Sequence, residues 1–171
     1  MAETKLQNYT VQEKLNKMDV DLITITPDTA TSACSAGEVV FQADEVQNMV
    51  AVKGGTCILQ SITLLDDDDH GQSIDIVFNN GNGLLDASTA GSTPIDVDDD
   101  ASSVPGGILG VVTISNYFDG INWKLGTKEN IGLVLKAADD TTSIYISAVN
   151  RGSAVTWTSE GLHLKLGIVK D

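Results

Sequence analysis

The sequence has few of the residues that build reactive or metal-binding sites. Its 171 residues include only two histidines and two cysteines, too few for a zinc cluster at ligand spacing. It has no Gly-x-Ser-x-Gly motif and no Gly-rich phosphate loop followed by Lys and Ser or Thr. His70 and His163 stand far apart, and neither has a recognisable partner motif. These absences argue against an enzyme, so we expect no catalytic residue and no cofactor.

A leader and a long apolar run are also missing. The first residues carry no apolar core of a secretory signal, and no later run approaches eighteen apolar residues. Cys34 lies in a loop of small residues, and Cys57 opens a β-like run. We therefore expect folding in a cytosol, where both cysteines stay free thiols rather than forming a bridge.

Basic residues are scarce, and one long stretch has none. The chain has ten Lys and Arg residues and 24 Asp and Glu residues, which gives a net charge of −14. Neither Lys nor Arg occurs between Lys53 and Lys124. Such a chain is a poor ligand for nucleic-acid phosphates or an anionic membrane. The charge favours solubility or a basic partner surface.

Aspartates cluster within that stretch. The four at 66–69 belong at a turn, because strong β-like runs flank them, and adjacent carboxylates can chelate a hard cation. Residues 96–100 resemble the opening of a calcium loop, but Ala101 and Gly107 stand where such a loop has Gly and Glu. We therefore expect solvated acidic turns without a metal. The residues that would hold Ca²⁺ if one bound are Asp66, Asp68, Asp96, Asp98 and Asp100.

From residue 20 onward, short β-rich runs alternate with turn residues. In the last run, Leu162, Leu164 and Leu166 point one way while His163 and Lys165 point the other, as in an antiparallel sheet with one wet face. Eight to ten such strands predict an all-β antiparallel sandwich, with a jelly roll preferred over an immunoglobulin-like topology. The expected strands are residues 21–26, 38–43, 46–52, 57–65, 74–78, 108–115, 121–125, 131–136, 143–149 and 161–169.

Residues 1–19 differ from the rest of the chain. They contain Lys5, Lys14 and Lys17, no glycine, and apolar residues too sparse for an amphipathic helix. The segment is either a frayed terminus or an N-terminal arm that orders on a partner, with residues 20–171 forming the single domain. The arm residues that would contact a capsid or another subunit are Leu6, Tyr9, Leu15 and Met18.

Three segments of the sequence resemble those of small virion structural proteins of tailed bacteriophages, the kind that decorate or cement an icosahedral capsid. They are residues 53–78, residues 127–137 together with 143–152, and the ending from Gly161. The resemblance covers about residues 37–171. It implies a β-sandwich bound to the major capsid protein on the virion surface, often as a homotrimer. It also implies synthesis in the host cytoplasm.

A second interpretation is a carbohydrate-binding or host-recognition module of a head fibre or tail. It depends on Trp123, Trp157, Tyr117 and Tyr145, which could stack on a sugar. Each tryptophan lies in or beside a β-run, however, and this favours packing inside the sandwich. Aromatic residues make up only 5% of the chain, which equips a sugar groove poorly.

Overall fold

The computed structural model describes residues 19–81 and 107–170. This part of the chain is all β-structure, and it contains no helix long and apolar enough to cross a membrane. Its nine strands are β1 (Asp19–Ile25), β2 (Val39–Val46), β3 (Thr56–Asp66), β4 (Ile74–Asn79), β5 (Ile108–Ile114), β6 (Tyr117–Asp119), β7 (Lys124–Lys136), β8 (Ile144–Asn150) and β9 (Leu162–Lys170).

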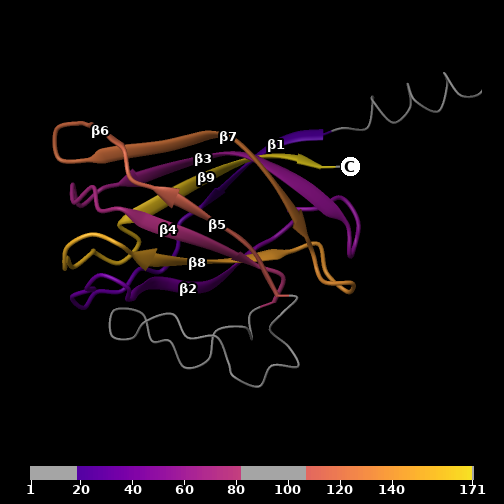
Figure 1. The fold of residues 1–171 in the computed structure, drawn as a ribbon, viewed down its shortest axis with the longest axis horizontal. Coiled ribbons are helices and arrows are strands. Elements are labelled where there is room, and N and C mark those ends of the chain that lie inside the picture. Colours follow the sequence, from indigo (N-terminus) through magenta and orange to yellow (C-terminus); the bar gives the residue numbers. More distant parts are fainter. Residues whose placement is uncertain (1–18, 82–106, 171) are drawn as a thin grey trace, which may run out of the picture.

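The strands form two antiparallel sheets that pack face to face, which confirms the predicted sandwich (Figure 1). One sheet has the order β1-β9-β3-β7-β6, and the other has the order β2-β8-β4-β5. The first strand therefore pairs with the last, β2 with β8, β3 with β7, and β4 with β5. A chain folded back on itself in this way and rolled into two sheets is a jelly roll.

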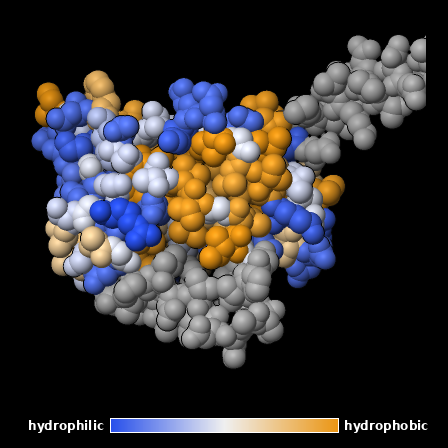
Figure 2. All heavy atoms as spheres, viewed as in Figure 1, coloured by the Kyte–Doolittle hydropathy of each residue, from blue (hydrophilic) through white to orange (hydrophobic). Residues whose placement is uncertain are grey.

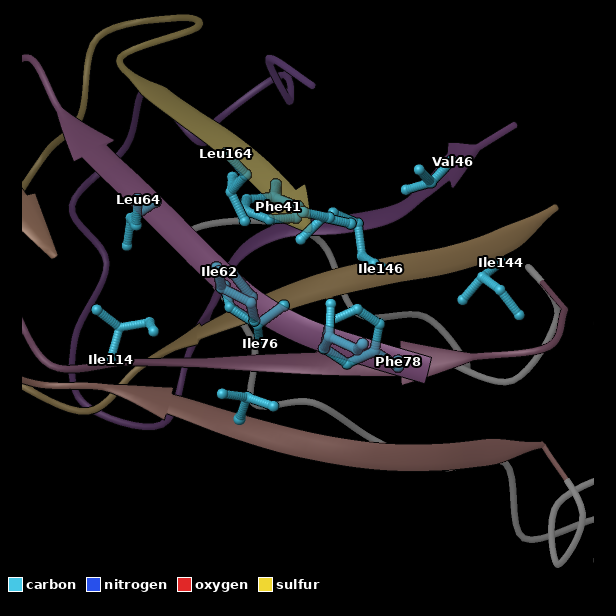
Figure 3. Close-up of a cluster of buried hydrophobic side chains, with 14 of the residues drawn as sticks. Phe41, Val46, Ile62, Leu64, Ile76, Phe78, Ile114, Ile144, Ile146 and Leu164 are labelled. Atoms are coloured by element: carbon cyan, nitrogen blue, oxygen red, sulfur yellow. The ribbon is translucent and has the colours of Figure 1, made fainter. Parts of the chain in front are cut away.

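The core lies between the sheets and is filled by the apolar residues of the alternating strands (Figure 3). Ile74, Ile76 and Phe78 on β4 are fully buried, as their alternation predicts. The same holds for the inward residues of β9, from Leu162 to Ile168. Side chains from both sheets meet there, so burial of one sheet requires the other.

Three of the expected strands differ in the structure. The weak run at 46–52 is no strand beyond Val46, because Met49 and Val50 turn inward from a loop and close one end of the core. The expected strand at 121–125 begins only at Lys124, where it opens β7. That strand continues through Asn130 and Gly132, both with positive φ, and takes in the expected strand at 131–136. The short strand β6 was not expected.

Candidate interaction surface

The turn after β3 holds four consecutive aspartates, and we call residues 66–70 the acidic turn. Each aspartate has a different partner, so the run is not merely solvated as the sequence predicted. Asp66 accepts two backbone N–H groups, from Asp68 at 3.1 Å and Gly71 at 2.8 Å. The other three bind other parts of the chain, namely Asp67 with His163, Asp68 with Thr158, and Asp69 with Lys124.

Asp66 anchors the acidic turn from inside the protein. Its side chain is 1% exposed at the end of β3. Burial raises the pKa of this carboxyl, and the N–H groups of Gly71 and Asp68 partly oppose that shift. Gly71 has a φ of 61° and lies directly under the Lys124 side chain, where a Cβ would not fit. The turn is thus held in one conformation by local bonds.

Asp66, Asp68 and His70 are the one group in the described residues that could gather around a cation. Each offers one ligand atom, and these atoms lie within 4.8 Å of one another. An imidazole nitrogen suits zinc rather than calcium, the ion for which the sequence offered these aspartates as candidates. Asp66 and Asp68 already accept hydrogen bonds from Gly71 and Thr158. The positions of the two carboxylates are therefore explained by their role in holding these loops together.

His163 joins two elements at the same end of the sandwich. Its Nε2 lies 2.9 Å from Asp67 Oδ2, and its Nδ1 lies 3.0 Å from Thr26 Oγ1. A hydroxyl, an imidazole and a carboxylate in series occur in hydrolases, where the hydroxyl is the nucleophile. Here Thr26 is an exposed secondary alcohol just after the edge strand β1. This series of hydrogen bonds therefore links the end of β1 to the acidic turn.

The turn between β6 and β7 exposes large apolar side chains beside the acidic turn. Phe118 is 67% exposed and Ile121 is 87% exposed. The ring of Trp123 lies 5.8 Å from that of Phe118 and packs over Gly120, where no Cβ would fit. We call this group, with the adjacent outward residues of the sheet, the hairpin patch: Leu65, Phe118, Ile121, Trp123 and Leu125.

Lys124 fixes the hairpin patch to the acidic turn. Its Nζ lies 2.5 Å from Asp119 Oδ1 and 3.2 Å from Asp69 Oδ1. The Gly120 N–H donates to the Trp123 carbonyl at 3.0 Å, which closes the turn. Figure 1 shows the β6–β7 turn at the end of the sandwich where the β3–β4 and β8–β9 loops also lie. The end is therefore both apolar and acidic, and it is internally braced.

A second exposed apolar group crosses the outer face of the five-stranded sheet. Val20 pairs with Val169, Val169 pairs with Ile58, and Ile58 pairs with Val134, so one outward residue from each of four strands forms a line. Val20 is 77% exposed and Val134 is 60% exposed. We call these four residues the apolar row.

Figure 2 shows a further concentration of hydrophobic residues over β5 and β7. The two strands lie together there, since a Cβ on Gly110 would be 2.7 Å from Leu133 Cδ2. Ile108 and Val111 on β5 are exposed, as is Val134 on β7. Apolar surface is thus frequent on an otherwise acidic domain.

The aromatic residues proposed for sugar stacking are not gathered at one surface. Trp157 is buried in the core, 1% exposed, with its ring edge-on to His70. Tyr117 donates its hydroxyl to the Gln72 carbonyl at 2.7 Å, and burial raises its pKa. Trp123 is partly exposed within the hairpin patch. Core packing, as the β-runs predicted, therefore applies to Trp157 and not to Trp123.

The remaining predicted site residues fall into two groups. Asp66 and Asp68 come together as described. The arm candidates and three calcium candidates lie outside the described residues: Leu6, Tyr9, Leu15, Met18, Asp96, Asp98 and Asp100. Sequence reasoning missed the hairpin patch, since Ile121-Asn-Trp-Lys-Leu has the alternation of a half-buried strand.

No family model matches the sequence, and no curated protein matches it. Several solved structures are similar in fold. A chain of the capsid of Ralstonia phage GP4 is 18% identical, with 91% of this chain and 85% of that chain covered and a TM-score of 0.42. A chain of tomato aspermy virus is 9% identical, with 89% and 76% covered and a TM-score of 0.39. At these sequence identities and TM-scores, the two structures show neither the family nor the function of this chain.

Proposed function

We propose that this protein is a virion structural protein that decorates or cements an icosahedral phage capsid. The observation that carries the proposal is the hairpin patch, where Phe118 and Ile121 stand in solvent on a braced, acidic end of the domain. Exposed apolar groups rimmed by polar residues mark protein-contact surfaces. The three sequence segments that resemble phage decoration proteins support the same proposal.

The proposed partner is the major capsid protein, with the domain on the outer surface of the virion. The N-terminal arm supplies further contacts through Leu6, Tyr9, Leu15 and Met18, and it gains order on binding. Synthesis in the host cytoplasm and assembly as a homotrimer belong to the same proposal. The jelly-roll sandwich, in which Cys34 and Cys57 are free thiols, is consistent with a role in the shell.

Quantitative mass spectrometry of purified virions tests the proposal. A decoration protein should be present in a copy number comparable with that of the major capsid protein. Absence of the chain, or only a few copies per particle, would count against it. A fibre or tail component would give that second result.

Addition of the purified full chain to particles that lack it tests the surface. We expect it to bind in saturable amounts, and an Ile121→Asp variant to bind about tenfold or more weakly, as for a buried interface anchor. Val52→Lys is the matched control, since Val52 is also exposed, at 63%, and lies outside the hairpin patch. Equal binding by wild type and Ile121→Asp would show that the hairpin patch does not contact the particle.

A further inference from the structure

We propose that Asp66, Asp68 and His70 form a binding site for one zinc ion in the acidic turn. The inference is independent of the proposed function, and it revises the sequence-based expectation of acidic turns without a metal. The three residues offer two carboxylate oxygens and one imidazole nitrogen, and these atoms lie within 4.8 Å of one another. Proteins bind zinc with this combination of ligand atoms, at about 2.0–2.2 Å from the ion.

Alternate residues of the acidic turn have different partners. Asp67 Oδ2 lies 2.9 Å from His163 Nε2, and Asp69 Oδ1 lies 3.2 Å from Lys124 Nζ. The other three members of the turn form no ion pair with the residues that the structure describes. A cation among these three would therefore balance two carboxylates that the described chain leaves without a basic partner.

Hydrogen bonds hold the two carboxylates in place and still leave them able to bind an ion. Asp66 accepts the N–H groups of Asp68 and Gly71, one on each oxygen. Asp68 Oδ2 accepts the Thr158 N–H at 2.7 Å. Each carboxylate oxygen has two lone pairs, so further acceptor capacity remains. Carboxylates that bind metals in proteins are hydrogen-bonded in this way, which fixes their orientation.

Hydrogen bonding does not explain His70. Its Nδ1 is buried and has no hydrogen-bond partner among the described residues, which costs free energy. The neighbouring Trp157 is 1% exposed, its ring lies edge-on to His70 with centroids 5.6 Å apart, and its Nε1 also has no partner in that part of the chain. A zinc ion takes an imidazole lone pair. With three protein ligands it keeps a water, which can accept a nearby indole N–H.

A small closure of the group is enough to form the site. Ligand atoms about 2.1 Å from a tetrahedral zinc ion lie roughly 3.4 Å apart. The present separations are no more than 4.8 Å, and His70 makes most of the movement because hydrogen bonds hold Asp66 and Asp68. The nitrogen ligand and the small number of side chains favour zinc over calcium, which takes about six to eight oxygen ligands.

Isothermal titration calorimetry of the full chain with zinc chloride tests the inference. The protein carries no affinity tag and is freed of metal with EDTA, which dialysis then removes. We expect one zinc ion per chain. His70→Gln and Asp68→Asn should bind it about tenfold or more weakly, because loss of even an outer partner of a metal ligand costs 10–100-fold.

His163→Gln and Asp67→Asn are the matched controls. They remove the same chemical groups from a contact of the same acidic turn, and they should bind zinc like the wild type. Calcium chloride, titrated in the same way, should bind the wild type far more weakly than zinc and should not depend on His70.

NMR of the wild-type imidazole groups locates the ion without changing the site. The chain has two histidines, so their signals can be assigned by comparison with His163→Gln. We expect zinc to shift the ring signals of His70 strongly and those of His163 little. This measurement does not depend on whether the variants at the site fold.

Three results would overturn the inference. The first is no binding of zinc by the wild type up to about 1 mM, the weakest specific range. The second is a larger effect of zinc on His163 than on His70. The third is calcium binding as tight as zinc binding, which would show that the turn attracts any divalent cation by charge alone. None of these results bears on whether the chain is present on virions.

Discussion

At the scale of single residues, buried polar groups decide where this chain is rigid. Asn150 shows this most clearly among the described residues. It is fully buried, and its side-chain amide donates to the carbonyls of Cys34 and Ser153 while its oxygen accepts the Gly152 N–H. One side chain thus holds two loops at the acidic end of the sandwich. Such satisfied groups are costly to change and tie neighbouring loops together.

The two cysteines should be inert in the folded protein. Burial raises the pKa of Cys34 and of Cys57 to about 11, and both side chains are inaccessible. Since the thiolate is the reacting form, Ellman's reagent at pH 8 should modify neither thiol in native protein and both in urea. Rapid labelling of one thiol in the native state would contradict the described packing.

Asp44 should make the protein more stable as the pH falls toward 4. Burial, and then repulsion by Asp28, raises the pKa of Asp44 above its ordinary value of 3.8. A raised folded-state pKa means that protonation favours folding. This stabilisation is complete below pH 3.8 and is lost as the pH rises through the folded-state pKa.

Replacement of Asp44 by Asn should therefore raise the free energy of unfolding at pH 7, with a gain that shrinks toward pH 4. Urea unfolding across this pH range measures the effect. Asp140→Asn, at an exposed position, removes the same charge without the burial. Identical pH profiles for the two variants would show that burial of Asp44 is unimportant.

At the scale of strands, close contact between the sheet edges depends on glycine. Gly126 on β7 is buried, and a Cβ there would collide with Ile114 and lie 2.9 Å from Tyr117 Cε1. The Tyr117 ring has little room to move, because its hydroxyl is bonded to Gln72. Gly126→Ala should lower the free energy of unfolding by about 1–3 kcal/mol, as overpacking does.

Urea unfolding of Gly126→Ala is compared with that of Gly81→Ala. No atom lies within 4 Å of a Cβ placed on Gly81, so we expect a far smaller change in that variant. Equal stability of both variants would mean that β7 moves away from Ile114 without cost.

Most strands could be predicted because they alternate buried and exposed residues. The β9 leucines and the β4 isoleucines follow this rule and are buried. The rule fails where a loop enters the core, as at Met49, since burial there follows from closing the sandwich end. It fails again at Ile121, where alternation continues into an exposed turn. Local pattern does not encode which apolar residues the assembled sheets leave uncovered.

The candidate site was predictable only in part for a related reason. The acidic run at 66–69 was correctly placed at a turn, but its partners come from β7, β9 and the loop before β9. Likewise, the apolar row joins Val20 to Val134 through the pairing of four strands. These contacts depend on the order of strands in the jelly roll, which the sequence pattern does not specify.

At the scale of the whole molecule, acidity and exposed apolar surface act together. A net charge of −14 makes separate copies repel one another, while the hairpin patch and the apolar row leave apolar side chains in solvent. Both properties suit the proposed role of decorating a shell, because such a protein must stay soluble until it reaches its binding place. The surface, rather than a reactive group, is therefore the proposed functional part of this domain.

A cryo-EM map of the assembled particle tests that account most directly. We expect this jelly-roll domain to fit repeated density on the outer face of the shell, in contact with the major capsid protein. The hairpin patch should be covered where the domain meets that protein. A bare shell, or density for this domain only at the tail or a fibre, would contradict the account.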